Sequence, residues 1–169
     1  MNTTSRVLLA AALVASLAAC SKKVKEAPVD ETVREDTVTE QVADDGMFGP
    51  EDLDTNSCLR QRIVYFDYDQ DALKPEFEEI MACHGKYLRD RPSARITLEG
   101  NADERGTREY NMGLGERRGN AVSTALQGNG GSASQLSVVS FGGERPTCTD
   151  AGEGCWSQNR RVEIVYTAK

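Results

Sequence analysis

Four short apolar segments that alternate with two helical segments constrain the fold of this chain more than any other feature. The strand-like segments are rich in β-branched and aromatic residues, and they cover Ile63–Asp69, Ala94–Gly100, Gln135–Gly142 and Arg160–Ala168. Helical periodicity covers Lys74–Pro92, with a proline near each end, and roughly Arg108–Gly128. The order strand, helix, strand, helix, strand, strand predicts an α+β fold, with a single mixed sheet and helices packed on one face.

The N-terminal part of the chain has the pattern of a secreted and lipidated protein. Arg6 precedes a short apolar run, Val7–Leu17, and the letters "LAAC" that end at Cys20 resemble a bacterial lipobox. We therefore expect a signal peptide over residues 1–19 and acyl chains on Cys20, which anchor the protein to a membrane. The alternatives are a cleaved signal with an incidental cysteine and an uncleaved anchor. Ser21, which is not acidic, implies the outer membrane by resemblance to Gram-negative sorting rules.

The segment that follows is too polar to form a core of its own. Ser21–Asn56 contains eleven acidic residues, four basic residues and a single aromatic residue. Such a composition buries too little apolar surface to offset the entropy lost on ordering. We interpret residues 20–57 as the lipidated cysteine followed by a disordered acidic tether, and residues 58–169 as the folded domain.

Four further cysteines lie in the predicted domain, and an oxidising compartment favours their pairing. Cys148 and Cys155 flank a short loop, while Cys58 precedes the first strand and Cys83 lies on the packed side of the first helix. We favour the pairs Cys58–Cys83 and Cys148–Cys155. The spacings lack the close CxxC pairs of zinc sites, so no metal site is predicted.

One stretch, "LEGNADERGTREYNMGLGERRGNAV" (residues 98–122), places charges of both signs around a turn and a helix. Asp103 can accept hydrogen bonds from an ammonium group, and the guanidinium of Arg118 can bind a carboxylate bidentately. Gly106 lets the backbone approach a ligand closely. The two charges therefore suit a zwitterionic amino-acid head group. The alternative is an internal Asp103–Arg118 ion pair.

The same residues carry a family resemblance. The stretches "VYFDYDQDAL", "EGNADERGTREYNMGLGERRGNAV", "VVSFGGERP" and "NRRVEIVY" resemble the OmpA-like peptidoglycan-binding domain. The resemblance implies that Asp103 and Arg118 bind the free end of meso-diaminopimelate in the peptidoglycan stem peptide. It places supporting contacts on Asp69, Thr107, Asn111 and Leu114. Arg117 is expected to face solvent or to support the structure.

The resemblance implies a non-catalytic protein that tethers the outer membrane to the cell wall and needs no cofactor. It also implies partners in the Tol system, such as the propeller protein TolB, with a role in envelope integrity and cell division. The alternatives are anchoring without Tol partners and a peptidoglycan-modifying enzyme. The only histidine, His84, is expected in the core and not in a catalytic set. Asn159, Arg160 and Arg161 are expected to begin the last strand and to support the Gly142–Gly154 loop; the alternative is that they help to bind the glycan.

Overall fold

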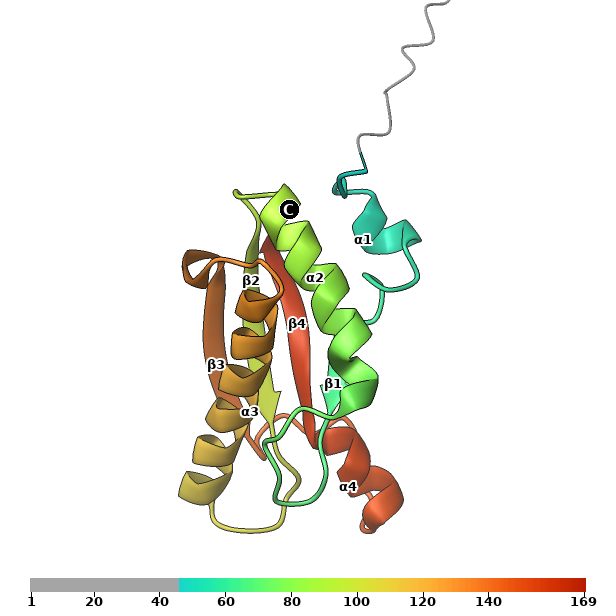
Figure 1. Cartoon of the computed structure of the whole chain (residues 1–169). Coiled ribbons are helices and arrows are strands. Elements are labelled where there is room, and N and C mark those ends of the chain that lie inside the picture. Colours follow the sequence, from blue (N-terminus) through green and yellow to red (C-terminus); the bar gives the residue numbers. More distant parts are fainter. Residues whose placement is uncertain (1–45) are drawn as a thin grey trace, which may run out of the picture. The chain divides into compact units, whose positions relative to one another are not determined.

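The structure is a computed structural model, and it describes residues 46–169 (Figure 1). The signal peptide, Cys20 and most of the expected tether lie outside these residues. The elements in chain order are α1 (Asp52–Thr55), β1 (Ile63–Tyr65), η1 (Pro75–Phe77), α2 (Glu78–Asp90), β2 (Arg95–Asn101), α3 (Arg108–Gly128), η2 (Ala133–Gln135), β3 (Leu136–Gly142), α4 (Glu153–Asn159) and β4 (Arg161–Ala168). Within residues 46–169, no helix is long and apolar enough to cross a membrane.

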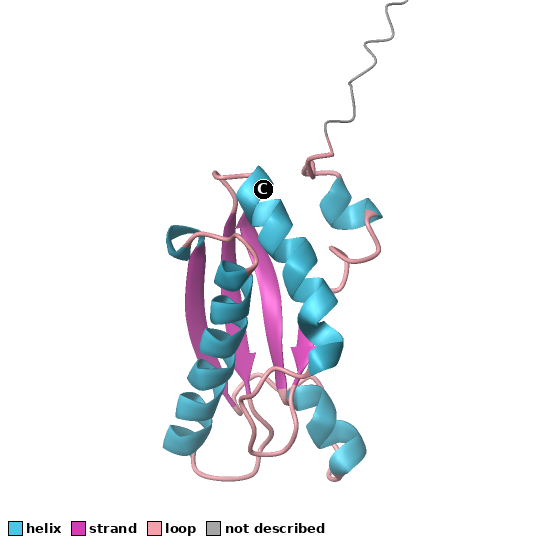
Figure 2. Ribbon diagram, viewed as in Figure 1, coloured by secondary structure: helices cyan, strands magenta, loops and turns pink. Residues whose placement is uncertain are grey.

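The strands form one sheet in the order β1-β4-β2-β3. β4 pairs antiparallel with both β1 and β2, whereas β2 and β3 are parallel and α3 connects them. Helices α2 and α3 lie on the same face of this sheet (Figure 2). The predicted α+β fold, with one mixed sheet and helices on one face, is confirmed.

The core lies between the sheet and the two long helices because the apolar residues of both follow their expected periodicities. Its fully or nearly fully buried members include Val64, Ile80, Met81, Tyr87, Leu88, Ile96, Leu98, Val122, Leu126, Val162 and Ile164. His84 is also fully buried on the inner face of α2, as the sequence predicts.

Two glycines allow α3 to approach the end of β2 closely. A β-carbon on Gly115 would lie 2.4 Å from the Ser140 side-chain oxygen and 2.8 Å from the carbonyl oxygen of Gly100. A β-carbon on Gly100 would lie only 2.0 Å from the carbonyl oxygen of Gly115. The absence of side chains here sets the spacing between α3 and the turn that follows β2.

The first strand is shorter than the sequence predicts. β1 ends at Tyr65, opposite Arg161, the residue with which β4 begins. One further backbone hydrogen bond joins the two segments, from the N–H of Phe66 to the carbonyl oxygen of Arg160 at 2.9 Å, and the residues from there to η1 form a loop. Asp69, which was expected inside the strand, lies in this loop with a φ of 58°, in the left-handed region.

Part of the expected tether is packed against the domain, which differs from our prediction. Leu53 in α1 is fully buried in the core, and Phe48 packs against the same cluster. The backbone N–H of Phe48 donates to Asp90 at 3.0 Å, and its carbonyl oxygen accepts from Arg91 at 2.7 Å. These two apolar residues and two hydrogen bonds hold a segment of acidic average composition against the domain.

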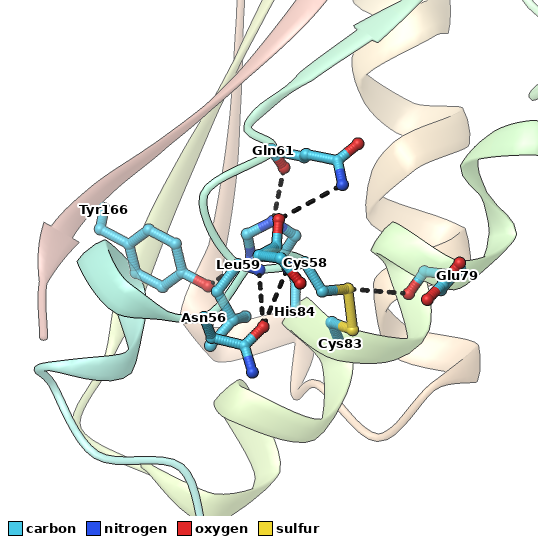
Figure 3. The surroundings of a disulfide bond; sticks show 9 residues. Asn56, Cys58, Leu59, Gln61, Glu79, Cys83, His84 and Tyr166 are labelled. Carbon is cyan, nitrogen blue, oxygen red and sulfur yellow. Dashed lines mark hydrogen bonds between the residues drawn. A yellow bond between two sulfur atoms is a disulfide. The ribbon is translucent and has the colours of Figure 1, made fainter.

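The structure contains both disulfides that the sequence favours, Cys58–Cys83 and Cys148–Cys155. The first joins the segment before β1 to α2, beside His84 (Figure 3). The second closes the loop before β4, where the structure has a short helix, α4, that the sequence analysis did not predict. Asn159 therefore ends α4 and does not begin the last strand.

Candidate functional site

A small cavity opens between the loop after β1, the turn after β2 and the N-terminal half of α3. Five of the six binding residues predicted from the sequence line it, and Thr107 does not. The lining residues are Tyr68, Asp69, Ala102, Asp103, Arg105, Gly106, Tyr110, Asn111, Leu114 and Arg118. The fold thus brings together residues from three separate segments at one end of the sheet.

Asp103 is buried, and its carboxylate is fully hydrogen-bonded. One oxygen accepts from the backbone N–H and from the Nε of Arg105, both at 3.1 Å. The other oxygen accepts from Arg105 Nη2 at 2.6 Å and from Arg160 Nη1 at 3.3 Å. Burial by itself would raise the pKa of Asp103, but the hydrogen bonds from Arg105 and Arg160 outweigh it and hold the pKa below its ordinary value. Asp103 is therefore ionised at neutral pH.

Arg118 is fully buried and binds backbone carbonyl oxygens. Its Nε donates to Gln70 at 2.8 Å, Nη1 donates to Asn101 at 2.9 Å, and Nη2 donates to Asp67 at 3.0 Å. Burial lowers the pKa of Arg118 to about 10, so the side chain stays charged at neutral pH. Three of the five N–H groups of a guanidinium are thus used to hold the loop after β1 against the end of β2.

The internal Asp103–Arg118 ion pair, which we considered as an alternative, is wrong for this structure. Among the described residues, the ion pairs of Asp103 are with Arg105 and Arg160. Arg160 was expected to support the preceding Gly142–Gly154 loop, and it also makes contacts at the cavity. Its buried guanidinium also donates to the carbonyl oxygen of Phe66 at 3.0 Å and pairs with Glu153.

Three of the predicted residues have clear structural contacts. The Thr107 side chain caps α3 by accepting from the backbone N–H of Tyr110 at 3.2 Å. Asn111 Nδ2 donates to the carbonyl oxygen of Asp103 at 3.0 Å, which fixes the turn relative to α3. Leu114 is buried and supplies an apolar wall of the cavity.

The acidic residues of the loop after β1 each have a separate cationic or hydroxyl partner. Asp67 lies 3.6 Å from Lys74, Asp71 pairs with Arg117 at 2.8 Å, and Asp69 accepts from the hydroxyl group of Tyr110. Arg117 is half exposed and lies outside the cavity, in agreement with its expected solvent-facing position.

Sequence analysis missed Arg105 and its two aromatic neighbours. The guanidinium of Arg105 lies 4.0 Å from the ring centre of Tyr68 and 4.2 Å from that of Trp156. Glu153, on the same helix as Trp156, is 3.7 Å from Arg105. The only local signal was a charge of opposite sign two positions after Asp103. The aromatic partners of Arg105 come from distant parts of the sequence.

A family model described as "OmpA family" matches residues 65–160, which include the whole cavity. The chain therefore belongs to the OmpA family. The C-terminal domain of MotB from Helicobacter pylori, at 21% identity, a TM-score of 0.57 and coverage of 63% of this chain and 83% of that chain, shows the same fold.

Two curated relatives and one solved structure share a name. The chain is 37% identical to the peptidoglycan-associated lipoprotein of Haemophilus influenzae over 166 residues, which cover 98% of this chain and all of the relative. It is 53% identical to the protein of that name from Pseudomonas putida over 100 residues, which span 59% of this chain and 60% of the relative. A crystal structure of the peptidoglycan-associated lipoprotein from Burkholderia pseudomallei matches with a TM-score of 0.66 and 41% identity, over 68% of this chain and 97% of that chain. Within the OmpA family, the chain belongs to the peptidoglycan-associated lipoproteins.

Proposed function

We propose that this protein binds peptidoglycan without a covalent bond and tethers the outer membrane to the cell wall. Its ligand is the free end of meso-diaminopimelate in the stem peptide, a head group that bears an ammonium and a carboxylate. The observation that carries the proposal is the cavity in which Asp103, Asp69, Arg105 and Arg118 converge beside the apolar wall of Leu114. The name of the relatives supports peptidoglycan as the polymer that is bound.

We propose that Cys20 carries the lipid that holds the other end of the tether in the outer membrane. The lipobox pattern and the lipoprotein name of the relatives support this anchor. We also propose that the protein works with the Tol system, including TolB, in envelope integrity and cell division. This part rests on the family resemblance alone.

A binding role explains the cavity better than a catalytic role. Hydrolysis of the wall needs an activated nucleophile, a metal ion or a carboxylate acid–base pair. The only histidine is fully buried between α2 and β4, and it does not line the cavity. The carboxylate of Asp103 is held by two arginines, so its pKa is lowered and not raised as a general acid requires.

Co-sedimentation with purified sacculi that contain diaminopimelate tests the proposal. We expect Asp103→Ala to lose most binding, because truncating one partner of a buried charge pair costs about 2–5 kcal/mol, or a factor of roughly thirty to several thousand in affinity. Arg118→Ala should lose binding as well, and Leu114→Ala should weaken it less because it removes packing and no charge. Arg117→Ala is the matched control and should bind normally, since its charge lies outside the cavity.

Two results would contradict the proposal. Normal binding by Asp103→Ala, with the fold intact by circular dichroism, would show that the cavity is not the binding site. Clearing of the sacculi by the wild-type protein would show that the protein is an enzyme.

A further inference from the structure

The carboxylate of Asp103 has no free acceptor position for an incoming ammonium group. A carboxylate offers about four acceptor sites, and here four donors occupy them. Arg105 supplies three of these donors and Arg160 supplies the fourth. A ligand ammonium can therefore reach Asp103 only if the Arg105 side chain gives up its hydrogen bonds.

Arg105 has contacts besides Asp103 that can keep it beside the cavity when its guanidinium turns away from that carboxylate. Its guanidinium lies between the rings of Tyr68 and Trp156, at 4.0 and 4.2 Å, and cation–π attraction holds it there independently of Asp103. Its side chain is 29% exposed, whereas that of Asp103 is 5% exposed, so Arg105 lies on the solvent side of the pair. It also lines the cavity.

Arg105 is also better placed than Arg118 to meet a ligand carboxylate. Arg118 is fully buried, and it donates to three backbone carbonyl oxygens that fix the surrounding loops. The partner of Arg105 is a side chain that a ligand can replace. Because the fork of a guanidinium matches any carboxylate, Arg105 can exchange one carboxylate for another with little loss.

We propose that Arg105 is a specificity-determining counter-ion that exchanges partners when the ligand binds. In the empty site it neutralises Asp103; in the occupied site the ligand ammonium takes its place on Asp103, and Arg105 pairs with the ligand carboxylate. This inference rests on the proposed function and adds a selection rule to it. A ligand that carries only an ammonium leaves Arg105 with Glu153 alone, a mostly exposed carboxylate 3.7 Å away that already pairs with Arg160, and beside two further cations, Arg118 and Arg160, so it binds weakly. A zwitterionic head group supplies the missing carboxylate.

The test compares two ligands that differ only in that carboxylate. The probes are a stem tripeptide that ends in meso-diaminopimelate and the same tripeptide with its distal carboxylate amidated. Binding to the full chain in detergent is measured by calorimetry. Trp156 is the only tryptophan of the chain and contacts Arg105, so its fluorescence reports separately on the position of the guanidinium.

We expect the wild-type protein to prefer the zwitterionic peptide by at least about tenfold, which corresponds to 1.4 kcal/mol. In Arg105→Ala the preference should fall to about threefold or less, and the amidated peptide should bind more tightly than it binds to the wild type, because Asp103 is then open. Arg105→Lys should restore part of the preference, since it keeps the charge but not the fork. Arg117→Ala should behave as the wild type, and Trp156 emission should change only with the zwitterionic peptide.

Several outcomes would overturn the inference. Equal binding of both peptides to the wild type would do so, and so would a full tenfold preference that survives in Arg105→Ala. An equal loss of both peptides in a folded Arg105→Ala variant would show that Arg105 only positions the turn. Failure of the wild type to bind either peptide, or sacculi, would refute the proposed function itself.

Discussion

The buried His84 should make the stability of the domain depend on pH. Its Nδ1 lies 2.7 Å from the hydroxyl group of Tyr166 and its Nε2 lies 3.0 Å from the carbonyl oxygen of Gln61 (Figure 3). Since a carbonyl oxygen can only accept, Nε2 carries the proton and the Tyr166 hydroxyl donates to Nδ1. The neutral imidazole thus satisfies both neighbours, and burial lowers the pKa of His84 from 6.5 to about 4.

The sign and size of the effect follow from these two pKa values. Between pH 6.5 and about 4, the unfolded chain binds a proton that the folded chain does not bind, so stability falls as the pH falls. At 1.36 kcal/mol per pH unit, the free energy of unfolding falls by about 3 kcal/mol over this whole interval. Roughly 2 kcal/mol of it should occur between pH 7 and pH 4.5, before most carboxylates titrate.

Urea unfolding at a series of pH values measures this loss, and His84→Gln is the control. Glutamine does not titrate, yet its amide can donate to the carbonyl oxygen of Gln61 and accept from the Tyr166 hydroxyl. Between pH 7 and pH 4.5, the free energy of unfolding should fall by about 2 kcal/mol more for the wild type than for the variant. Parallel curves would refute the reasoning and show that His84 titrates alike in both states.

Three further predictions concern packing, the domain boundary and the anchor. Gly115→Ala should lower the free energy of unfolding by about 1–3 kcal/mol, because its β-carbon would overlap the Ser140 side chain in β3 and the Gly100 carbonyl oxygen in β2. Gly113→Ala, whose β-carbon would lie 3.5 Å from its nearest neighbour, should be neutral or stabilising in the same urea assay. Leu53→Ala should lower the free energy of unfolding by about 2–5 kcal/mol, measured by thermal unfolding. An unchanged midpoint would show that this segment belongs to the tether and not to the folded domain. Cys20→Ala should release the protein from the outer-membrane fraction or leave an unprocessed precursor, and a variant of mature size that stays in this fraction would disprove lipidation.

Periodicity made the main elements predictable, whereas α4 depended on contacts that no local pattern reveals. Ile80 and Leu88 recur at helical spacing in α2, and Ile164 follows the alternation of β4, so burial could be inferred from spacing alone. In α4, by contrast, Gly154 disfavours a helix. The element is held by a disulfide and by the Asn159 side chain, which accepts from the backbone N–H groups of Thr147 and Cys148 at 2.8 and 3.1 Å.

The candidate site was predictable where it lies on one turn and one helix. Asp103, Asn111, Leu114 and Arg118 share a short stretch of sequence, so helix geometry places them near one another. The burial of Arg118 was not predictable, because arginine is rarely buried unless nearby groups accept its hydrogen bonds, and here the acceptors are carbonyl oxygens of a distant loop. Arg160 and Trp156 reach the site only through the tertiary fold.

The central position of β4 governs the order in which this sheet can be completed. β4 follows the other strands along the chain, yet it lies between β1 and β2, and within residues 46–169 it is the only strand that bonds to β1. During synthesis, which proceeds from the N-terminus, β2, α3 and β3 can assemble as a local unit. β1 has no neighbouring strand until β4 has been made. The two parts of the sheet therefore stay separate until β4, the last of these strands along the chain, is in place.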